Sequence, residues 1–219
     1  MANLSNKKVL ITSGPTVERI DPVRYISNFS SGKMGKAICD AFSRAGAKVC
    51  VVTGPVNVKY DSAESVINVE SAEEMLAACR NEFDDTDIAI CCAAVCDYRP
   101  KHQFDAKLKK GKDDSKLSCI ELTKNPDILK TLCDIKNENQ YIVGFCAETN
   151  NIIDNATSKL SSKGCDMIVA NDVIKGKVFG KDDTSATIIT NSSSTEFKSG
   201  TKAELAELLV KLISKQFDK

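Results

Sequence analysis

The chain has 219 residues, and its 30 Lys and Arg balance 30 Asp and Glu, so the formal net charge is zero. This balance gives no reason to expect attraction to nucleic acid or to an anionic membrane surface. No apolar stretch approaches the ~20 residues of a membrane span, and the start lacks a signal-peptide pattern. We therefore expect a cytoplasmic protein in which residues 1–219 form one domain, with small molecules or protein as partners.

Short β-branched segments bounded by Gly, Pro, Asn or Asp predict the strands of a buried parallel sheet. They are residues 9–12, 49–53, 66–69, 88–95, 141–145 and 167–170. Between the first two, Ser31 to Ala47 has the apolar spacing of a helix that stops near Gly46. This alternation predicts an α/β fold with a doubly wound, mostly parallel sheet and a ligand site at the carboxyl ends of its strands.

Start signals mark three further helices. They are a capping box of Ser71 with Glu74, a cap at Asn125 followed by Pro126, and a second box of Thr201 with Glu204. Residues 186–199 predict a C-terminal β-hairpin before a last helix over residues 202–217.

The polar segment from Arg99 to Lys116 has no apolar period and predicts a mobile flap. It contains a run of lysines that begins with Lys107. Such a run is usually a solvated loop. The alternative is a lysine that closes on a phosphoryl group once substrate is bound and stabilises its charge.

Several of the ten cysteines lie inside apolar segments, such as Cys91 and Cys92 in DIAICCAAV. Free cysteine in that setting behaves as a small hydrophobe, so we interpret them as reduced thiols. A zinc site needs closely spaced ligands, and the sequence has no C-x-x-C pair and one histidine, His102. We expect no metal held by the protein alone.

A long connection, from Ser13 to Gly35, separates the first strand from the first helix. Such connections usually have about two to six residues, so its length favours a binding loop. Ser30, Ser31 and Gly32 bring hydroxyl and amide groups to a helix N-terminus, which favours phosphate as the ligand. The alternative is a plain helix cap and turn. Neither the dinucleotide fingerprint nor the P-loop pattern is present.

Small or polar residues also follow later strands. Ala93 and Ala94 let a flat ring approach the backbone, although close packing of strand and helix explains them equally well. Asp97 stands where an acid binds ribose hydroxyls in nucleotide-binding folds, or else it caps a turn. Further polar and aromatic groups reach the same edge from later strand ends, at Phe145, Asn171 and Asp172.

Six motifs follow one another between about Val9 and Val173: GPTVERIDPVRYISNFSSGKMG, AAVCDYRP, KLKK, NPDIL, GFCAETNN and ANDV. Together they closely resemble the phosphopantothenoylcysteine synthetase family, in its free-standing bacterial form without flavin. The resemblance implies a modified Rossmann-like fold. It also implies a ligase that joins 4'-phosphopantothenate to L-cysteine in coenzyme A biosynthesis and works as a homodimer.

The resemblance further implies how the reaction runs. CTP activates the phosphopantothenate carboxylate as an acyl-cytidylate with Mg²⁺ on the phosphates, and the cysteine amine then forms the amide; ATP is the alternative nucleotide. Asn28 would handle the intermediate, and Lys107 would neutralise the α-phosphate. The triphosphate would lie against Gly14, Ser30, Ser31 and Gly32, and the base and ribose against Ala93, Ala94, Asp97 and Phe145.

Two other functions stay open from the residues. Strand, loop and helix followed by AGAKVCVVTG is also typical of NAD(P)-dependent oxidoreductases, although no glycine fingerprint follows the first strand. A nucleotide-binding module without catalysis would keep the same cleft. The presence of Asn28 and Lys107 favours the ligase over such a module.

Overall fold

The computed structural model describes residues 3–148, 151–172 and 183–217. Its centre is an eight-stranded sheet with the order β12-β11-β10-β9-β6-β1-β4-β5. The strands are β1 (Lys8–Ser13), β4 (Lys48–Thr53), β5 (Ser65–Asn68), β6 (Ile88–Cys91), β9 (Tyr141–Glu148), β10 (Met167–Asp172), β11 (Asp183–Thr190) and β12 (Ser194–Thr201). The strands from β5 across to β10 are parallel, and the β11–β12 hairpin is antiparallel. The predicted fold class is confirmed.

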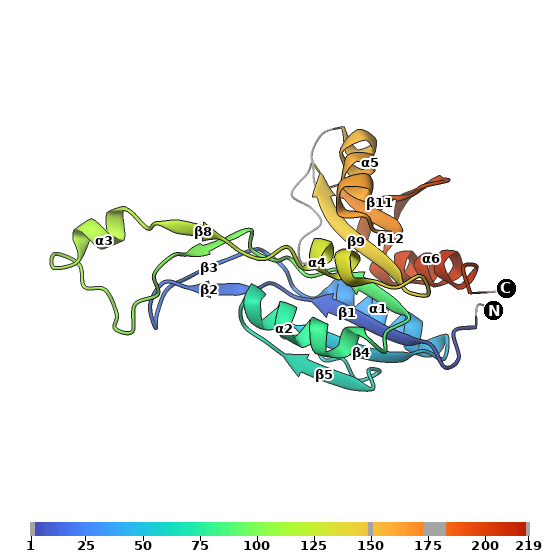
Figure 1. Ribbon diagram of the computed structural model, residues 1–219, viewed down its shortest axis with the longest axis horizontal. Helices are drawn as coiled ribbons and strands as arrows, with labels where there is room; N and C mark the ends of the chain where they lie inside the picture. The colour runs from blue at the N-terminus through green and yellow to red at the C-terminus, as the bar shows by residue number, and fades with distance from the viewer. Residues whose placement is uncertain (1–2, 149–150, 173–182, 218–219) are drawn as a thin grey trace.

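Helices cover both faces of the sheet (Figure 1). Helices α1 (Lys33–Arg44) and α6 (Lys202–Ser214) pack on one face, and α2 (Ala72–Phe83), α4 (Ile128–Ile135) and α5 (Ile152–Lys163) pack on the other. Along β1, Val9 and Ile11 enter the first apolar cluster while Leu10 enters the second. Because successive side chains of a strand point to opposite faces, a strand covered on both sides is apolar throughout. No helix among the described residues is long and apolar enough to cross a membrane.

The helix ends agree with the predicted signals in part. Thr201 and Glu204 form the predicted capping box of α6. Ser71 accepts from the Glu74 amide, but the Glu74 carboxylate accepts from the Glu70 amide, so this box is half formed.

The predicted cap at Asn125 is wrong. Helix α4 begins at Ile128, and its cap is Asp127, which accepts from the Lys130 amide at 2.9 Å. The Asn125 side chain donates instead to the Cys96 carbonyl at 2.9 Å.

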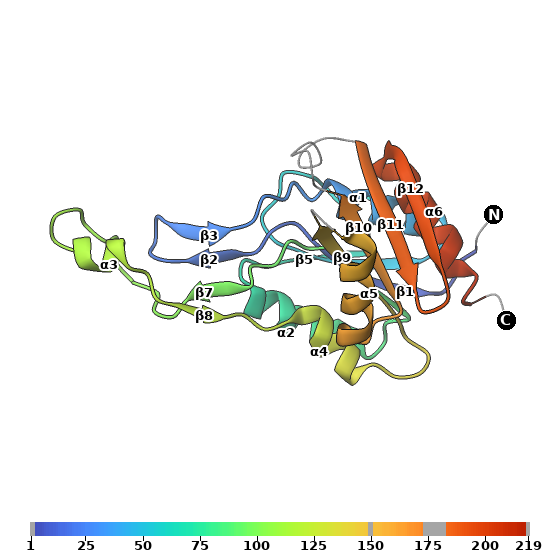
Figure 2. The ribbon, with the colours of Figure 1, turned by 90° about the horizontal axis from the view of Figure 1, so that it is seen from above.

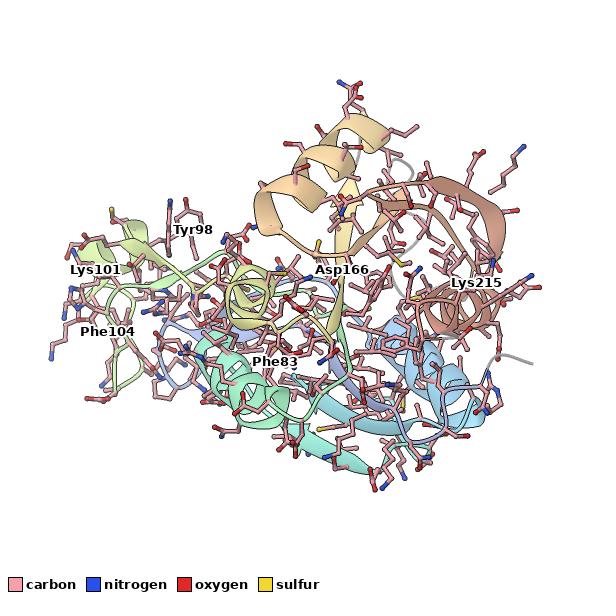
Figure 3. All side chains as sticks on the ribbon, turned by 45° about the vertical axis from the view of Figure 1, so that its right-hand side comes forward. Phe83, Tyr98, Lys101, Phe104, Asp166 and Lys215 are labelled. Carbon is pink, nitrogen blue, oxygen red and sulfur yellow. The ribbon has the colours of Figure 1, made fainter. Side chains whose placement is uncertain are left out.

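An arm projects from the carboxyl edge of the sheet (Figures 1 and 2). It consists of two two-stranded ribbons and a short helix at its tip: β2 (Val17–Arg19) with β3 (Tyr25–Ser27), β7 (Tyr98–Pro100) with β8 (Leu122–Lys124), and α3 (Asp114–Ser118). The segment predicted as a flap therefore runs along the arm, where Lys101 and Phe104 lie in Figure 3. The predicted strand over residues 88–95 ends at Cys91, and the chain then leaves the sheet for this arm.

Candidate functional site

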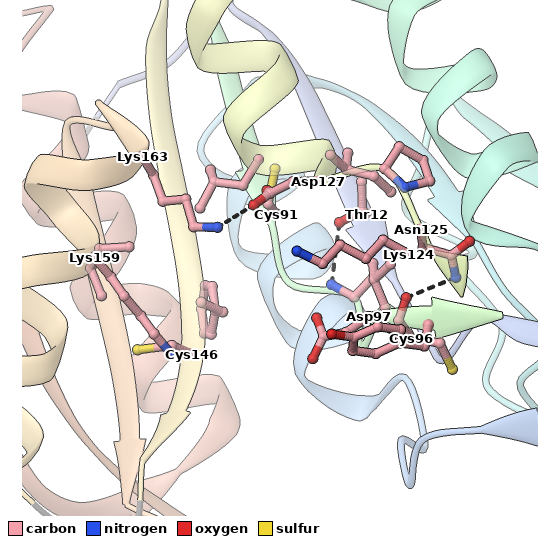
Figure 4. Close-up of a pocket in the computed structure, with 18 residues that line it drawn as sticks. Thr12, Cys91, Cys96, Asp97, Lys124, Asn125, Asp127, Cys146, Lys159 and Lys163 are labelled. Carbon is pink, nitrogen blue, oxygen red and sulfur yellow. Dashed lines mark hydrogen bonds and ion pairs between the residues drawn. The ribbon is translucent and has the colours of Figure 1, made fainter. Parts of the chain in front are cut away.

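A first cavity, of about 620 Å³, opens at the carboxyl ends of β6 and β9, against the start of α4 and the end of α5 (Figure 4). Three predicted nucleotide-binding residues line it: Ala93, Asp97 and Phe145. Polar residues that the sequence analysis did not select line it as well: Lys124, Asn125, Asp127, Lys159 and Lys163. Two of these residues could have been selected from the sequence. Lys159 and Lys163 are four residues apart, so on a helix they lie on the same face.

The first cavity carries charge of both signs. Lys163 ion-pairs with Asp127, and Lys159 and Lys124 add two more positive side chains to the lining. Asp97 is exposed, and its carbonyl accepts from the Asn125 amide at 2.9 Å. Lysines beside a carboxylate suit a ligand that combines phosphate with hydroxyl groups.

A second cavity, of about 170 Å³, lies at the N-terminus of α1. Its lining includes most of the predicted phosphate-binding and nucleotide-binding residues: Ser30, Ser31, Gly32, Ala93, Ala94, Phe145 and Asn171. The two cavities share Ala93, Phe145 and Cys146, so they adjoin. The structure thus brings residues from four distant segments to one continuous site.

The N-terminus of α1 has no side-chain cap. Its N-cap residue is Gly32, with a φ of 73°, and neither Ser30 nor Ser31 caps the helix. The alternative explanation of these serines as helix caps is therefore wrong. A helix N-terminus carries about half a positive charge and amide donors, so this one offers an anion site in the second cavity.

Buried hydroxyl groups support this turn from behind. The Tyr60 hydroxyl donates to Ser13 Oγ at 2.7 Å, and Ser13 Oγ donates to the Gly32 carbonyl at 3.5 Å. A Cβ at Gly35 would lie 2.0 Å from Ser13 Oγ, so no larger residue fits there. Burial raises the pKa of Tyr60, so its hydroxyl stays a proton donor at neutral pH. The role of these residues could not be predicted from the sequence, because a serine at the end of a strand and a tyrosine in a loop form no recognisable motif.

Asn28 and Gly14 both hold the loop at Ala94. Asn28 Nδ2 donates to the carbonyl of Val95 at 3.0 Å and to that of Ala94 at 3.4 Å. The Gly14 carbonyl accepts from the Ala94 amide at 2.8 Å, and Gly14 has a φ of 71° beside Val56. Gly14 lines neither cavity, so its visible role is to shape the backbone behind them.

Asn171 brings an unsatisfied acceptor to the second cavity. Its Oδ1 is buried and accepts no hydrogen bond from the part of the chain that the structure describes. Buried acceptors are nearly always paired in native proteins, so this atom fits a donor on a ligand. The side chain of Asp172, also predicted to bind nucleotide, lies outside the described residues.

Lys107 does not join the other predicted residues. It is exposed and lines neither cavity. The backbone amide of its neighbour Leu108 donates a hydrogen bond to Asp21, which lies in the turn that joins β2 to β3. Asn28 follows β3 at the opposite, inner end of the same hairpin. Within one chain, the two residues predicted to be catalytic are thus separated by the length of the hairpin.

All ten cysteines are free thiols. Burial raises the pKa of Cys92 to about 12 and also raises that of Cys96, whose Sγ lies 3.7 Å from the Thr16 carbonyl. These thiols are therefore protonated and poorly reactive at neutral pH. Among the described residues, no three His, Cys, Asp or Glu side chains gather as a metal site would require.

Comparison with known proteins identifies the family. Residues 4–217 match the model described as the DNA/pantothenate metabolism flavoprotein C-terminal domain. The coenzyme A biosynthesis bifunctional protein CoaBC of Haemophilus influenzae is 43% identical over 217 residues, which cover 99% of this chain and 54% of that protein. The chain thus spans about half the length of the curated relatives that it matches.

Solved structures agree with this match. A crystal structure of the C-terminal domain of a coenzyme A biosynthesis bifunctional protein CoaBC has a TM-score of 0.84 at 38% identity, and covers 100% of this chain and 99% of its own. A DNA/pantothenate metabolism flavoprotein from Streptococcus pneumoniae has a TM-score of 0.80 at 25% identity, and covers 96% of this chain and 99% of its own. The family resemblance predicted from the motifs is confirmed.

Proposed function

Because the chain belongs to the DNA/pantothenate metabolism flavoprotein C-terminal domain family, we propose that it is a phosphopantothenate–cysteine ligase of coenzyme A biosynthesis. The relatives' names include coenzyme A biosynthesis, which supports the pathway. The observation that carries the proposal is the joined pair of cavities. One presents the uncapped N-terminus of α1 to an anion, and the other presents lysines and Asp97 to the rest of a nucleotide.

The proposed chemistry activates a substrate carboxylate that does not react with an amine by itself. A carboxylate does not acylate an amine at neutral pH, because oxide is a poor leaving group. CTP attaches a cytidylyl group to the 4'-phosphopantothenate carboxylate and releases pyrophosphate, and the cysteine amine then displaces CMP. Mg²⁺ would enter with CTP and would offset part of the charge of its phosphates.

Each part of the site then has a role. The triphosphate lies at Ser30, Ser31 and Gly32, where amide donors and the helix dipole offset its charge. The ribose and base lie in the first cavity beside Asp97 and Phe145. Asn28 lines neither cavity, but it donates to the carbonyls of Ala94 and Val95 in their lining, and from there it steadies the acyl intermediate.

A reconstitution assay tests the function directly. The protein is incubated with Mg²⁺, CTP or ATP, phosphopantothenate and cysteine, and pyrophosphate and product are measured. Release of both with CTP supports the proposal, and a preference for ATP would change the nucleotide. Reduction of NAD(P)⁺ would favour an oxidoreductase, and nucleotide binding without turnover would favour a binding module.

A substitution at Asn28 tests the mechanism. Asn28→Asp should still bind CTP while kcat falls roughly 10²-fold, since loss of one positioned polar group costs about that much. Asn191→Asp is the matched control, because Asn191 is exposed in the turn of the β11–β12 hairpin. Full activity of Asn28→Asp would remove Asn28 from the mechanism.

We further propose that two copies pair through the arm. Five of the eight exposed large apolar side chains among the described residues lie on the arm or at its base: Val23, Tyr25, Phe29, Tyr98 and Leu122. Clustered apolar exposure of this kind marks a protein interface. A second copy would also explain Lys107, because a neighbouring arm can bring its lysine to a cleft that Lys107 of the same chain does not line.

Mixed dimers test the origin of this lysine. Asn28→Ala and Lys107→Ala proteins, each expected to keep only a low residual activity alone, are combined under conditions that exchange subunits. If Lys107 acts across the dimer, one site in each mixed dimer regains both residues and activity returns. If Lys107 acts within its own chain, every site keeps one lesion and the mixture stays inactive.

A further inference from the structure

One buried carboxylate joins the two ribbons of the arm. The Asp21 side chain is fully buried, with 0% of its surface exposed, in the turn between β2 and β3. Its Oδ1 accepts from the amides of Val23 and Arg24, both at 2.8 Å. Its Oδ2 accepts from Arg24 Nη1 at 2.8 Å and from the Leu108 amide at 3.2 Å. The last bond reaches across 87 residues of sequence.

The Leu108 backbone is held from its other side as well. The Arg24 guanidinium, fixed by Asp21, donates to the Leu108 carbonyl at 3.4 Å and 3.3 Å. The Leu108 side chain is buried at 4% exposure, and the Phe104 amide donates to the Ile20 carbonyl at 2.9 Å nearby. The loop that carries Lys107 is thus fastened to the β2–β3 turn by side-chain and backbone contacts.

This carboxylate is suited to hold a fixed geometry. Burial alone would raise the pKa of Asp21, but hydrogen bonds from the Val23, Leu108 and Arg24 amides, with the Arg24 charge, lower it. Both oxygens accept two donors each, so an amide in place of the carboxylate would set an NH₂ group against a pair of donors. The site therefore requires the ionised carboxylate and not only its shape.

We propose that Asp21 is a positioning residue for the ligase reaction, which fixes the Leu108 backbone so that Lys107 is presented in one orientation beside the β2–β3 turn. This inference rests on the proposed function, because only that function gives Lys107 a role in a reaction. Asp21 touches neither cavity and is not itself a catalytic residue.

The first test measures amide hydrogen exchange. In Asp21→Asn, exchange over residues 104–109 should rise at least tenfold, while exchange in β1 and β9 stays as in the wild type. Glu18→Gln is the matched control, because Glu18 is a buried carboxylate on the same hairpin. Glu18 accepts a hydrogen bond from the Ala72 amide and not from residues 104–109. Unchanged exchange at Leu108 in Asp21→Asn would overturn the proposal.

A second variant covers the case in which Asp21→Asn does not fold. Arg24→Lys keeps the charge beside Asp21 but removes the forked guanidinium that reaches the Leu108 carbonyl. Exchange over residues 104–109 should rise in this variant too, by a smaller factor. No change there would contradict the role given to these contacts.

The last test is a double-mutant cycle on kcat. Asp21→Asn should lower kcat at least tenfold with an unchanged dissociation constant for CTP, and it should cause little further loss in a Lys107→Met background. An equal loss in both backgrounds would show an effect that does not pass through Lys107 and would overturn the inference. Absence of product from the wild-type protein would instead defeat the proposed function, and the exchange data would still decide whether Asp21 holds the loop.

Discussion

The sheet and the arm of this protein are built on different interactions. In the sheet, strands such as β1 are buried on both faces and enter two apolar clusters. In the arm, strands of three residues are held by ribbon hydrogen bonds, by Asp21 and by exposed ion pairs such as Lys101 with Glu121. Several apolar side chains of the arm, such as Tyr25 and Tyr98, are exposed, whereas Ile20 and Leu108 are buried. The body is thus densely packed and carries both cavities, whereas the arm leaves several large apolar side chains exposed.

The largest expected contrast comes from glycines. A Cβ at Gly54, in the body, would lie 1.7 Å from the Pro15 carbonyl oxygen. Gly54→Ala should lower the free energy of unfolding by about 3 kcal/mol or more, because a backbone atom cannot move aside. At Gly111, in the arm, no atom lies within 4 Å and only the φ of 84° opposes a side chain. Gly111→Ala should cost about 1 kcal/mol.

Urea denaturation of the two variants measures this difference. Equal loss of stability in Gly54→Ala and Gly111→Ala would contradict the division between a packed body and an open arm.

The second prediction concerns the apolar surface of the arm. Tyr25 is 60% exposed, and Tyr25→Ser should weaken dimerisation roughly 30-fold, or about 2 kcal/mol, as expected for an aromatic interface residue. Ile153, on α5, is 57% exposed, so Ile153→Ser is a control with matched exposure in the body. Sedimentation equilibrium gives both constants. If Ile153→Ser weakened dimerisation more than Tyr25→Ser, the dimer interface would lie on the body and not on the arm.

The third prediction returns to the body. Lys163 pairs with Asp127 in the lining of the first cavity. Lys163→Met should weaken CTP binding roughly tenfold, about 1.4 kcal/mol, because a charge-assisted contact to the nucleotide is lost. Lys130→Met is the control, since Lys130 pairs with Asp134 and lines neither cavity. Calorimetry that finds equal CTP affinity in the two variants would remove Lys163 from the site.

The smallest effect belongs to an ion pair of the arm. Lys101 and Glu121 join the chain beside β7 and β8 at 2.6 Å, with side chains 49% and 62% exposed. Lys101→Ala should change the free energy of unfolding by less than about 0.5 kcal/mol, because exposed ion pairs contribute little. Urea denaturation measures this change. A loss above about 1 kcal/mol in the free energy of unfolding would show that exposed ion pairs contribute substantially to the stability of the arm.

The same division explains what the sequence predicts. Apolar runs and helix caps mark the body, so its six parallel strands, the C-terminal hairpin and α6 follow from the pattern. The arm carries no such period, since Tyr98–Pro100 pairs with Leu122–Lys124 through three residues on each side. Its strands are too short to alternate visibly, and their partners are far along the chain. The ribbons and the path of the flap segment were therefore not predictable.

The site shows the same limit. Ser30 to Gly32 directly precede α1, Ala93 follows β6, and Phe145 and Asn171 lie in the carboxyl-terminal halves of β9 and β10. Parallel topology places such positions at one edge. The separation of Lys107 from Asn28 depends on the ribbons, which the sequence pattern did not reveal. Ser13 and Tyr60 were missed because their role is a contact between hydroxyls buried behind the site.

The wall that the two cavities have in common limits what can occupy both of them. Any molecule long enough to reach from one chamber to the other passes Ala93, Phe145 and Cys146. A compound that fills both cavities should accordingly make contacts with these three side chains wherever its ends are placed. Because Cys146 lines both cavities, its thiol offers a point to which a spanning molecule could be tethered.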